Sequence, residues 1–401
     1  MQIEDGIFAK GPETEVMQQG PSGQIGIGAT LADESEVSAY GGPERRRAPR
    51  SPIARPQWAI PRIDFLLPEQ VPDRAAILSA LDEDTLAACR RAVAGAGAER
   101  ALALGALAAL LPSDKAERAC DPAGLIAAGD GASPEVHDAF FRVRRVAHGH
   151  PAGYLHSLLA AREVLQLDVE EAGSTVGEAD LAAIAEALAA ALAIGIGVAI
   201  GAPAGRAGTN WTRAERPVEV LHAVRRWIHG HQVFAALTQA LIFAFEAIDT
   251  AGAAGNDAAL LEAADLAAIT LRACAASLRF TGDFPAEVYE DLIRISMGSP
   301  FQPDGFSGLL SSDHRHLVRR MKLTKSSLDA LRERDASAYE RIAAELAGVY
   351  DAHKCVCSRF VGTDRSSLMM VREVGRSAID HLDRFKTTRL RAIGADGPPE
   401  P

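Results

Sequence analysis

Near the C-terminus, one long stretch constrains the fold most, because its apolar residues recur every three or four positions. A stripe with this period buries one face of an α-helix against a protein core. A Ser-x-x-Glu capping box at Ser337 predicts the start of the helix, and Gly362 predicts its end. We therefore expect His353 and Cys357 on the buried face, one turn apart. The stripe consists of Tyr339, Ile342, Ala343, Leu346, Val349, Tyr350, His353, Cys357 and Phe360.

A histidine and a cysteine at this spacing allow three interpretations. Both residue types are common in ordinary cores, so packing alone accounts for them. A structural zinc site would need a second spaced pair of ligands, which Cys355 does not supply. In the third interpretation, His353 gives an axial nitrogen to a haem iron, and Cys357, about 5–6 Å away, forms a thioether with a vinyl group. This order reverses the C-x-x-C-H signature of covalent haem, and Cys355 lies off the stripe as a bystander.

The composition of the chain limits which binding partners and which cellular location we expect. The 401 residues are 48% hydrophobic and carry a net charge of −11, so nucleic acid and anionic membranes are poor partners. Five cysteines without paired spacing, and no secretory pattern at the start, indicate a cytoplasmic protein. Residues 1–60 are rich in Gly, Pro, Ser and charge, which predicts a disordered N-terminal segment. Residues 61–395 predict a single helical domain.

Two other stretches leave a choice of structure. Residues 134–148 begin with Ser-Pro, which suits a helix start, and carry Phe140, Val143 and Val146 on one helical face, so we predict one helix here. Residues 176–201 are apolar enough to suggest a membrane span. Because acidic residues interrupt them and alanine adds little to membrane insertion, a buried helix is the better prediction.

Two further segments bring histidines towards the same core. Residues 217–248 predict a long helix with His231 on its apolar stripe and its other two histidines off it. A Gly-, Ser- and Pro-rich loop, residues 298–313, delivers His314 to a helix start. Histidines on different helices can face one cofactor from opposite sides. His314 and His231 are therefore both candidates for a second iron ligand opposite His353.

Three motifs, in this order, resemble the haem-dependent tryptophan dioxygenase superfamily. Residues 231–234 (H-Q-V-F) are similar to its distal-histidine segment H-Q-x-Y, and residues 299–303 (S-P-F-Q-P) to its S-G-F-Q-S loop. His353, with Arg359 six residues later and then Gly-Thr at 362–363, is similar to the axial-histidine pattern. The resemblance implies an all-α helical bundle around a haem, with His353 and Arg359 at the cofactor.

The departures from that pattern point to a particular branch of the superfamily. The loop that is G-T-G-G-S in the family is G-T-D-R-S here, and Ser307 stands near the place of the arginine that holds the substrate carboxylate. These differences speak against tryptophan ring cleavage. The H-x-x-x-C order of His353 and Cys357 resembles the 3-methyl-L-tyrosine hydroxylases of saframycin-type antibiotic pathways. That resemblance implies a haem held by a single thioether and a labile second histidine ligand on the iron.

The same resemblance implies the insertion of one oxygen atom into the ring of 3-methyl-L-tyrosine, giving 3-hydroxy-5-methyl-L-tyrosine, with peroxide or with dioxygen and a reductant. His314 is our choice for the labile ligand, which becomes an acid or base when released. His231 is the alternative ligand, and otherwise lines the distal pocket. The substrate contacts expected for such a site are Arg365 or Thr363 at the amino-acid carboxylate and Phe306 or Phe301 at the ring.

The residues alone are also compatible with three other functions. They are an aromatic-ring dioxygenase, a c-type haem sensor or electron-transfer protein, and a helical scaffold without haem. Helices rich in small residues allow close packing between subunits, so a homodimer stays open as well.

Overall fold

The structure is a computed structural model that describes residues 60–95, 97–111, 132–146, 149–199, 218–303, 305–362 and 377–395. Within it, Trp58–Pro401 forms one compact unit. The N-terminal segment predicted to be disordered lies, apart from Ile60, outside the described residues, and its disorder stays a prediction.

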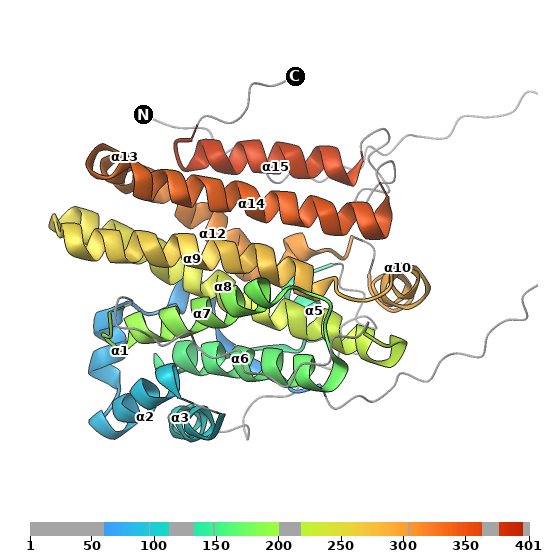
Figure 1. The fold of residues 1–401 in the computed structure, drawn as a ribbon, viewed down its shortest axis with the longest axis horizontal. Coiled ribbons are helices and arrows are strands. Elements are labelled where there is room, and N and C mark those ends of the chain that lie inside the picture. The colour runs from blue at the N-terminus through green and yellow to red at the C-terminus, as the bar shows by residue number, and fades with distance from the viewer. Residues whose placement is uncertain are drawn as a thin grey trace, which may run out of the picture. The chain divides into compact units, whose positions relative to one another are not determined.

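The described residues form an all-α fold, as the sequence predicts (Figure 1). Short 3-10 turns cover Pro68–Gln70 and Gly308–Leu310. A π turn, Tyr289–Ile293, joins the short helices α10 (Ala286–Val288) and α11 (Arg294–Ser296). The helices are α1 (Arg74–Ala80), α2 (Glu83–Ala94), α3 (Gly97–Ala109), α5 (Pro134–Phe140), α6 (Ala152–Ala172), α7 (Glu178–Gly195), α8 (Val220–Ala254), α9 (Asp257–Thr281), α10 (Ala286–Val288), α11 (Arg294–Ser296), α12 (Ser312–Leu323), α13 (Lys325–Arg334), α14 (Ala336–Val361) and α15 (Ala378–Ala392).

Helix α8 lies at the centre and packs against α6, α7, α9, α12 and α13 (Figure 1). By length and composition alone, it is the one helix of the described residues that is able to cross a bilayer. In its most apolar window, 67% of the residues are buried inside the protein, as in the core helix of a globular fold. The stretch predicted as a buried helix, residues 176–201, forms α7, and its apolar residues are indeed buried.

Two short strands were not predicted. β1 (Ile63–Leu66) pairs in parallel with β2 (Val143–Val146), with Ile63 opposite Val143. The predicted helix over residues 134–148 is therefore wrong beyond Phe140. The chain turns at Arg142, which has a positive φ of 58°, and Val143–Val146 then form a strand. The partner strand lies far away in the sequence, so a local helical pattern could not reveal it.

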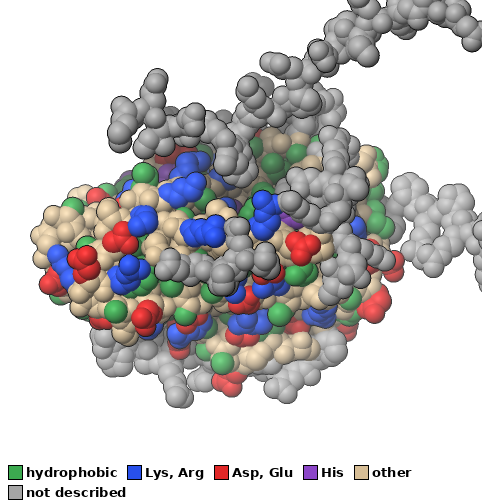
Figure 2. Space-filling model, turned by 90° about the horizontal axis from the view of Figure 1, so that it is seen from above, with side chains coloured by type: hydrophobic (Ala, Val, Ile, Leu, Met, Phe, Trp, Pro, Cys, Tyr) green, Lys and Arg blue, Asp and Glu red, His purple; other side chains and the backbone are tan. Residues whose placement is uncertain are grey.

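Helix α14 follows the predicted stripe but begins slightly earlier. The side chain of Asp335 accepts a hydrogen bond from the Ala338 amide at 2.9 Å, so Asp335, and not the predicted Ser337, caps the helix. Lys386 of α15 pairs with Asp351 of α14 at 2.8 Å. On the face seen in Figure 2, basic and acidic side chains are interspersed, as on an ordinary solvated surface.

The helices around α8 are joined by a buried arginine. Arg226 has no exposed surface and donates to Asp168 at the end of α6, to the Gly173 carbonyl at 2.5 Å and to Asp283 after α9 at 2.9 Å. His229, which the sequence pattern places off the apolar stripe, is also buried, with Nδ1 2.8 Å from Asp168. The expectation that only one face of α8 is buried was therefore wrong, because neighbouring helices cover the helix on several sides.

The buried charges in this group compensate one another. Burial alone would raise the pKa of Asp168, but hydrogen bonds and charge from His229 and Arg226 hold that pKa below its ordinary value. The guanidinium of Arg226 also lies 4.4 Å from the ring centre of Phe280. The group thus joins α6, α8 and the turn that follows α9.

Removing this cation should destabilise the protein strongly. We expect Arg226→Met to lower the free energy of unfolding by about 3–5 kcal/mol, because two carboxylates would stay buried without their partner. Urea unfolding followed by circular dichroism measures this loss. The control is Arg272→Met, which breaks an ion pair whose arginine is 58% exposed and should change stability by no more than about 1 kcal/mol. Equal losses for the two variants would contradict the central role of Arg226.

Candidate functional site

Three of the predicted histidines come together between α8, α12 and α14. Burial lowers the pKa of His231 to about 3, and the pKa values of His314 and His353 to about 4 each. Positive charge on His353 would lower the pKa values of His231 and His314 further, so His353 lies within electrostatic reach of both. All three are therefore neutral at pH 7, the state in which imidazole binds a metal.

A small cavity of about 40 Å³ opens beside this group of histidines. His314 lines it from α12, and Val349 and Tyr350 line it from α14, one turn before His353. The other walls come from α8 and α9 and are mostly apolar. Of the three histidines, His314 thus borders this apolar space directly.

Cys357 lies one turn beyond His353, partly buried and packed against the core, whereas Cys355 is exposed. The predicted roles of the two cysteines as attachment site and bystander stay predictions. Burial raises the pKa of Cys357 to about 11, so the group is a neutral thiol at pH 7. Among the described residues, no three His, Cys, Asp or Glu side chains lie close enough to hold a bare metal ion, whereas a haem needs only one or two protein ligands.

Arg359 anchors the end of α14. Its guanidinium donates to the carbonyl oxygens of Gly282 at 2.9 Å and Phe284 at 2.7 Å. The same turn carries Asp283, the partner of Arg226, so the end of α14 is tied to the central ion group. The predicted cofactor contact of Arg359 stays a prediction.

Aromatic rings form one side of the site. The Phe141 ring stacks on His231 with centroids 3.8 Å apart and an interplanar angle of 15°, and Trp227 lies 4.6 Å from the same histidine. Phe306 is buried and lies 6.1 Å from Phe141. We call this set the aromatic wall; it consists of Phe140, Phe141, Trp227, Phe284, Tyr289, Phe306 and Phe360.

Of the two phenylalanines predicted to contact the substrate ring, only Phe306 belongs to the aromatic wall. Phe306 is buried, whereas Phe301 is 37% exposed. Thr363 and Arg365 lie outside the described residues, so their proposed contact with a carboxylate stays a prediction.

The histidine rings differ in how firmly they are held. Nδ1 of His231 lies 2.7 Å from the Trp227 carbonyl oxygen, so this nitrogen carries the proton and Nε2 carries the lone pair. Within the described part of the chain, the rings of His314 and His353 have no hydrogen-bond partner. Their ring nitrogens are therefore free to bind a ligand.

A second buried arginine, which we did not predict, fixes the start of α12. Arg145 on β2 donates to Asp313, which has no exposed surface, and to Asp138 on α5. Gln239 of α8 also donates to Asp313, at 2.9 Å. Since His314 follows Asp313 directly, these bonds determine where the His314 backbone lies.

His137 is the fourth histidine of the region and was also missed. Its Nδ1 lies 3.3 Å from the Asp138 carboxylate, and its ring packs on Phe141 at 4.8 Å. Positive charge on His137 would lower the pKa values of His231 and His314, so it lies within reach of both. The only sequence feature that marks His137 is the neighbouring Asp138 within a short helix, and His-Asp pairs are too common to predict a functional site.

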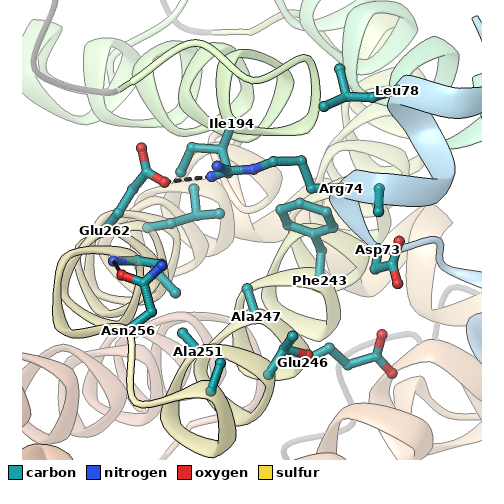
Figure 3. Close-up of a pocket in the computed structure, with 16 residues that line it drawn as sticks. Asp73, Arg74, Leu78, Ile194, Phe243, Glu246, Ala247, Ala251, Asn256 and Glu262 are labelled. Carbon is teal, nitrogen blue, oxygen red and sulfur yellow. Dashed lines mark hydrogen bonds and ion pairs between the residues drawn. The ribbon is translucent and has the colours of Figure 1, made fainter.

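A larger cavity, of about 360 Å³, lies elsewhere and contains none of these histidines (Figure 3). It is bordered by α1, α7, α8 and α9, and its lining includes Phe243 and several alanines. Arg74 pairs with Glu262 beside it, and burial raises the pKa of Glu246. Volume alone would select this cavity as a ligand site, but none of the predicted histidines lines it, whereas His314 lines the smaller one.

The model of the SfmD 3-methyl-L-tyrosine peroxygenase family matches residues 64–338, more than half of the chain. The chain belongs to this family. The match to the SfmD family includes His231, Phe306 and His314 and ends before His353 and Cys357. The family resemblance predicted from the motifs is therefore confirmed, whereas the H-x-x-x-C haem motif lies beyond the matched residues.

A curated SfmD-family relative and a solved structure extend this comparison. A 3-methyl-L-tyrosine peroxygenase from Streptomyces lavendulae is 31% identical over 171 residues, which cover 43% of this chain and 47% of the relative, or about half of each. The crystal structure of reduced SfmD, soaked with sodium hydrosulfite, superposes with a TM-score of 0.56 at 23% identity over 73% of this chain and 97% of the other. This likeness shows that the helical fold is shared.

The lowered pKa values of these histidines should make stability depend on pH. We expect the free energy of unfolding of the haem-free protein to fall as the pH drops from about 6.5 towards 4. In that window the unfolded chain binds protons on histidine, whereas His314 and His353 in the folded protein stay neutral until about pH 4. The unfolded state therefore binds more protons, and stability is greatest above this range.

Urea unfolding at a series of pH values measures this slope. Carboxylates contribute to it as well, so the comparison is with a variant carrying His231→Gln, His314→Gln and His353→Gln. The variant should show a flatter profile between about pH 6.5 and 4. An identical slope in the two proteins would contradict the neutral state of the histidines.

Proposed function

We propose that the protein is a haem-dependent monooxygenase of the peroxygenase type that hydroxylates the ring of 3-methyl-L-tyrosine. The observation that carries the proposal is that His314 of α12 and His353 of α14, both neutral at pH 7 and partly shielded from solvent, lie within electrostatic reach of each other, with Cys357 one turn beyond His353. Membership of the SfmD 3-methyl-L-tyrosine peroxygenase family supports the same reaction and substrate. The product would be 3-hydroxy-5-methyl-L-tyrosine, made in the cytoplasm for antibiotic biosynthesis, with peroxide or with dioxygen and a reductant.

The residues fit a haem. His353 has a free, neutral ring nitrogen for the iron, and Cys357 lies on the same side of α14, where it would form a single thioether with a vinyl group. The neighbouring walls are apolar, as a porphyrin requires. When bound, the haem supplies the oxidising chemistry, and the protein supplies orientation and the exclusion of water.

His314 is the better candidate for the second iron ligand. Its ring makes no hydrogen bond within the described residues, and it lines the cavity shared with α14. His231 is held by the Trp227 carbonyl and by the Phe141 ring, so it suits a fixed place in the distal pocket. A neutral imidazole of His314 that is not bound to the iron would be able to accept a proton from the oxidant or the phenol.

The aromatic wall provides the surface for the substrate ring. Phe306, with Phe140 5.0 Å away, offers a buried face on which a phenol packs while water is excluded. Arg365, or Thr363, would hold the amino-acid carboxylate, Arg365 because its planar fork matches a carboxylate. No nucleic acid or membrane is needed for this reaction, and a homodimer stays open.

The alternative is an aromatic-ring dioxygenase or a c-type haem sensor or electron-transfer protein. The mass of the product distinguishes the dioxygenase from the proposed hydroxylase, because ring cleavage adds two oxygen atoms and hydroxylation adds one. A sensor or electron-transfer protein would bind no aromatic amino acid, so a haem spectrum unchanged by 3-methyl-L-tyrosine would favour it.

The covalent attachment predicts a clear result in a denaturing mass spectrum. The protein should keep the mass of haem, and peptide mapping should find it on the peptide that contains Cys357. Cys357→Ala should release the haem on denaturation, whereas the control Cys355→Ala should retain it because that side chain is exposed. Haem that stays attached in Cys357→Ala would overturn the thioether.

The ligand assignment predicts different effects for two histidine replacements. His314→Ala should convert a six-coordinate resting absorption spectrum into a five-coordinate one, because the second nitrogen is lost. His231→Ala should leave the coordination unchanged while weakening substrate binding. If His231→Ala alone changed the coordination, the two roles would have to be exchanged.

A further inference from the structure

We infer that His137 recognises the phenol hydroxyl of the substrate and makes the site select phenols over rings without a hydroxyl. The inference rests on the proposed function, since it concerns the same site and an aromatic amino acid. It assigns a role to a residue that neither the motifs nor the family match singles out.

The tautomer of His137 is fixed by its neighbours. Asp138 receives two bonds from Arg145, at 2.7 and 3.2 Å, and its Oδ1 lies 3.3 Å from Nδ1 of His137. Burial would raise the pKa of Asp138, but hydrogen bonds from His137 and Arg145 and the charge of Arg145 hold that pKa below its ordinary value. The ionised carboxylate can only accept, so Nδ1 of His137 carries a proton, and in the tautomer that carries this proton alone Nε2 presents a lone pair.

The position of His137 suits contact with a bound phenol. Its ring lies 4.8 Å from Phe141, which stacks on His231 from the other side. It also lies 6.2 Å from Phe306 in a stacked orientation, so it belongs to the surface proposed for the substrate ring. A phenol that packs on this wall would find in Nε2 an acceptor for its O–H.

The second ring nitrogen of His137 is available to a ligand. In the described residues only Nδ1 of His137 has a partner, and Nε2 is not among the nitrogens closed off from solvent, so a ligand can reach it. Arg145 already connects Asp138 to Asp313 without help from the imidazole. The buried ion group is therefore complete without Nε2.

The consequence is selectivity. An acceptor that the bound ligand shields from water remains unpaired when a ring without the hydroxyl binds, and such sites reject the analogue that lacks it. We expect the protein to bind 3-methyl-L-tyrosine at least about tenfold more tightly than 3-methyl-L-phenylalanine.

Two amide replacements separate recognition from structure. In His137→Gln, the amide reaches roughly to the place of Nε2 but loses the contact with Asp138. In His137→Asn, the shorter amide keeps a donor near Asp138 but has nothing at the place of Nε2. Dissociation constants of both amino acids are measured by calorimetry on the haem-loaded proteins, with His156→Gln, a histidine of α6, as the control.

We expect His137→Asn to bind both ligands with nearly equal affinity and His137→Gln to keep most of the preference, with the control like the wild type. The opposite order, or full preference in His137→Asn, would overturn the role of His137 while the proposed function stands. If the wild-type protein bound neither amino acid, the proposed function itself would fail, and this inference with it. A circular dichroism spectrum for each variant verifies that the helices are retained.

Discussion

The fold depends on one fully buried guanidinium, that of Arg226. Such a charge is costly to remove from water, and only the convergence of Asp168, Asp283 and the Gly173 carbonyl compensates for that cost. These partners come from the end of α6 and from the turn after α9, so the charge can be satisfied in one arrangement of the helices only. The same turn receives Arg359 of α14 through the carbonyls beside Asp283. The helix with His353 and Cys357 is thereby positioned by an ion group that contains neither residue.

The other half of the site is positioned in the same way. Arg145 and Gln239 hold Asp313, and hence the first turn of α12, against β2 and α8. A cofactor gripped between two helices needs its ligands within a fraction of an ångström of the right place, which flexible side chains on unsupported helices do not provide. Buried ion groups add little stability on balance, but they allow few alternative packings. The two arginines therefore explain how a core rich in alanine can present histidines from three helices at one place.

The local parts of this arrangement could be predicted from the sequence and the long-range parts could not. The spacing of His353 and Cys357 and the inward direction of His231 follow from helical periodicity, which a single stretch of chain contains. The pairing of β1 with β2 joins segments about 80 positions apart, and Arg145 meets Asp313 across 168 positions, so neither has a local signature. His137 gains its meaning only when Arg145 folds onto Asp138. His229 was misjudged because periodicity assumes one buried face, whereas α8 is covered on several.

The position of His314 limits how it can be a labile ligand. A loop that opens would release the imidazole by moving the backbone, but His314 lies in the first turn of α12, where the Ser311 side chain accepts a bond from its amide and the preceding Asp313 is held by Arg145. Melting this turn would leave buried charges without partners, which is a large cost for each catalytic cycle. Rotation of the unbonded ring about its side-chain torsions costs far less and is fast. If His314 is the labile ligand proposed above, its exchange would therefore be a competition between the imidazole and the substrate for the same space, and the rigid backbone would return the ring to the same place.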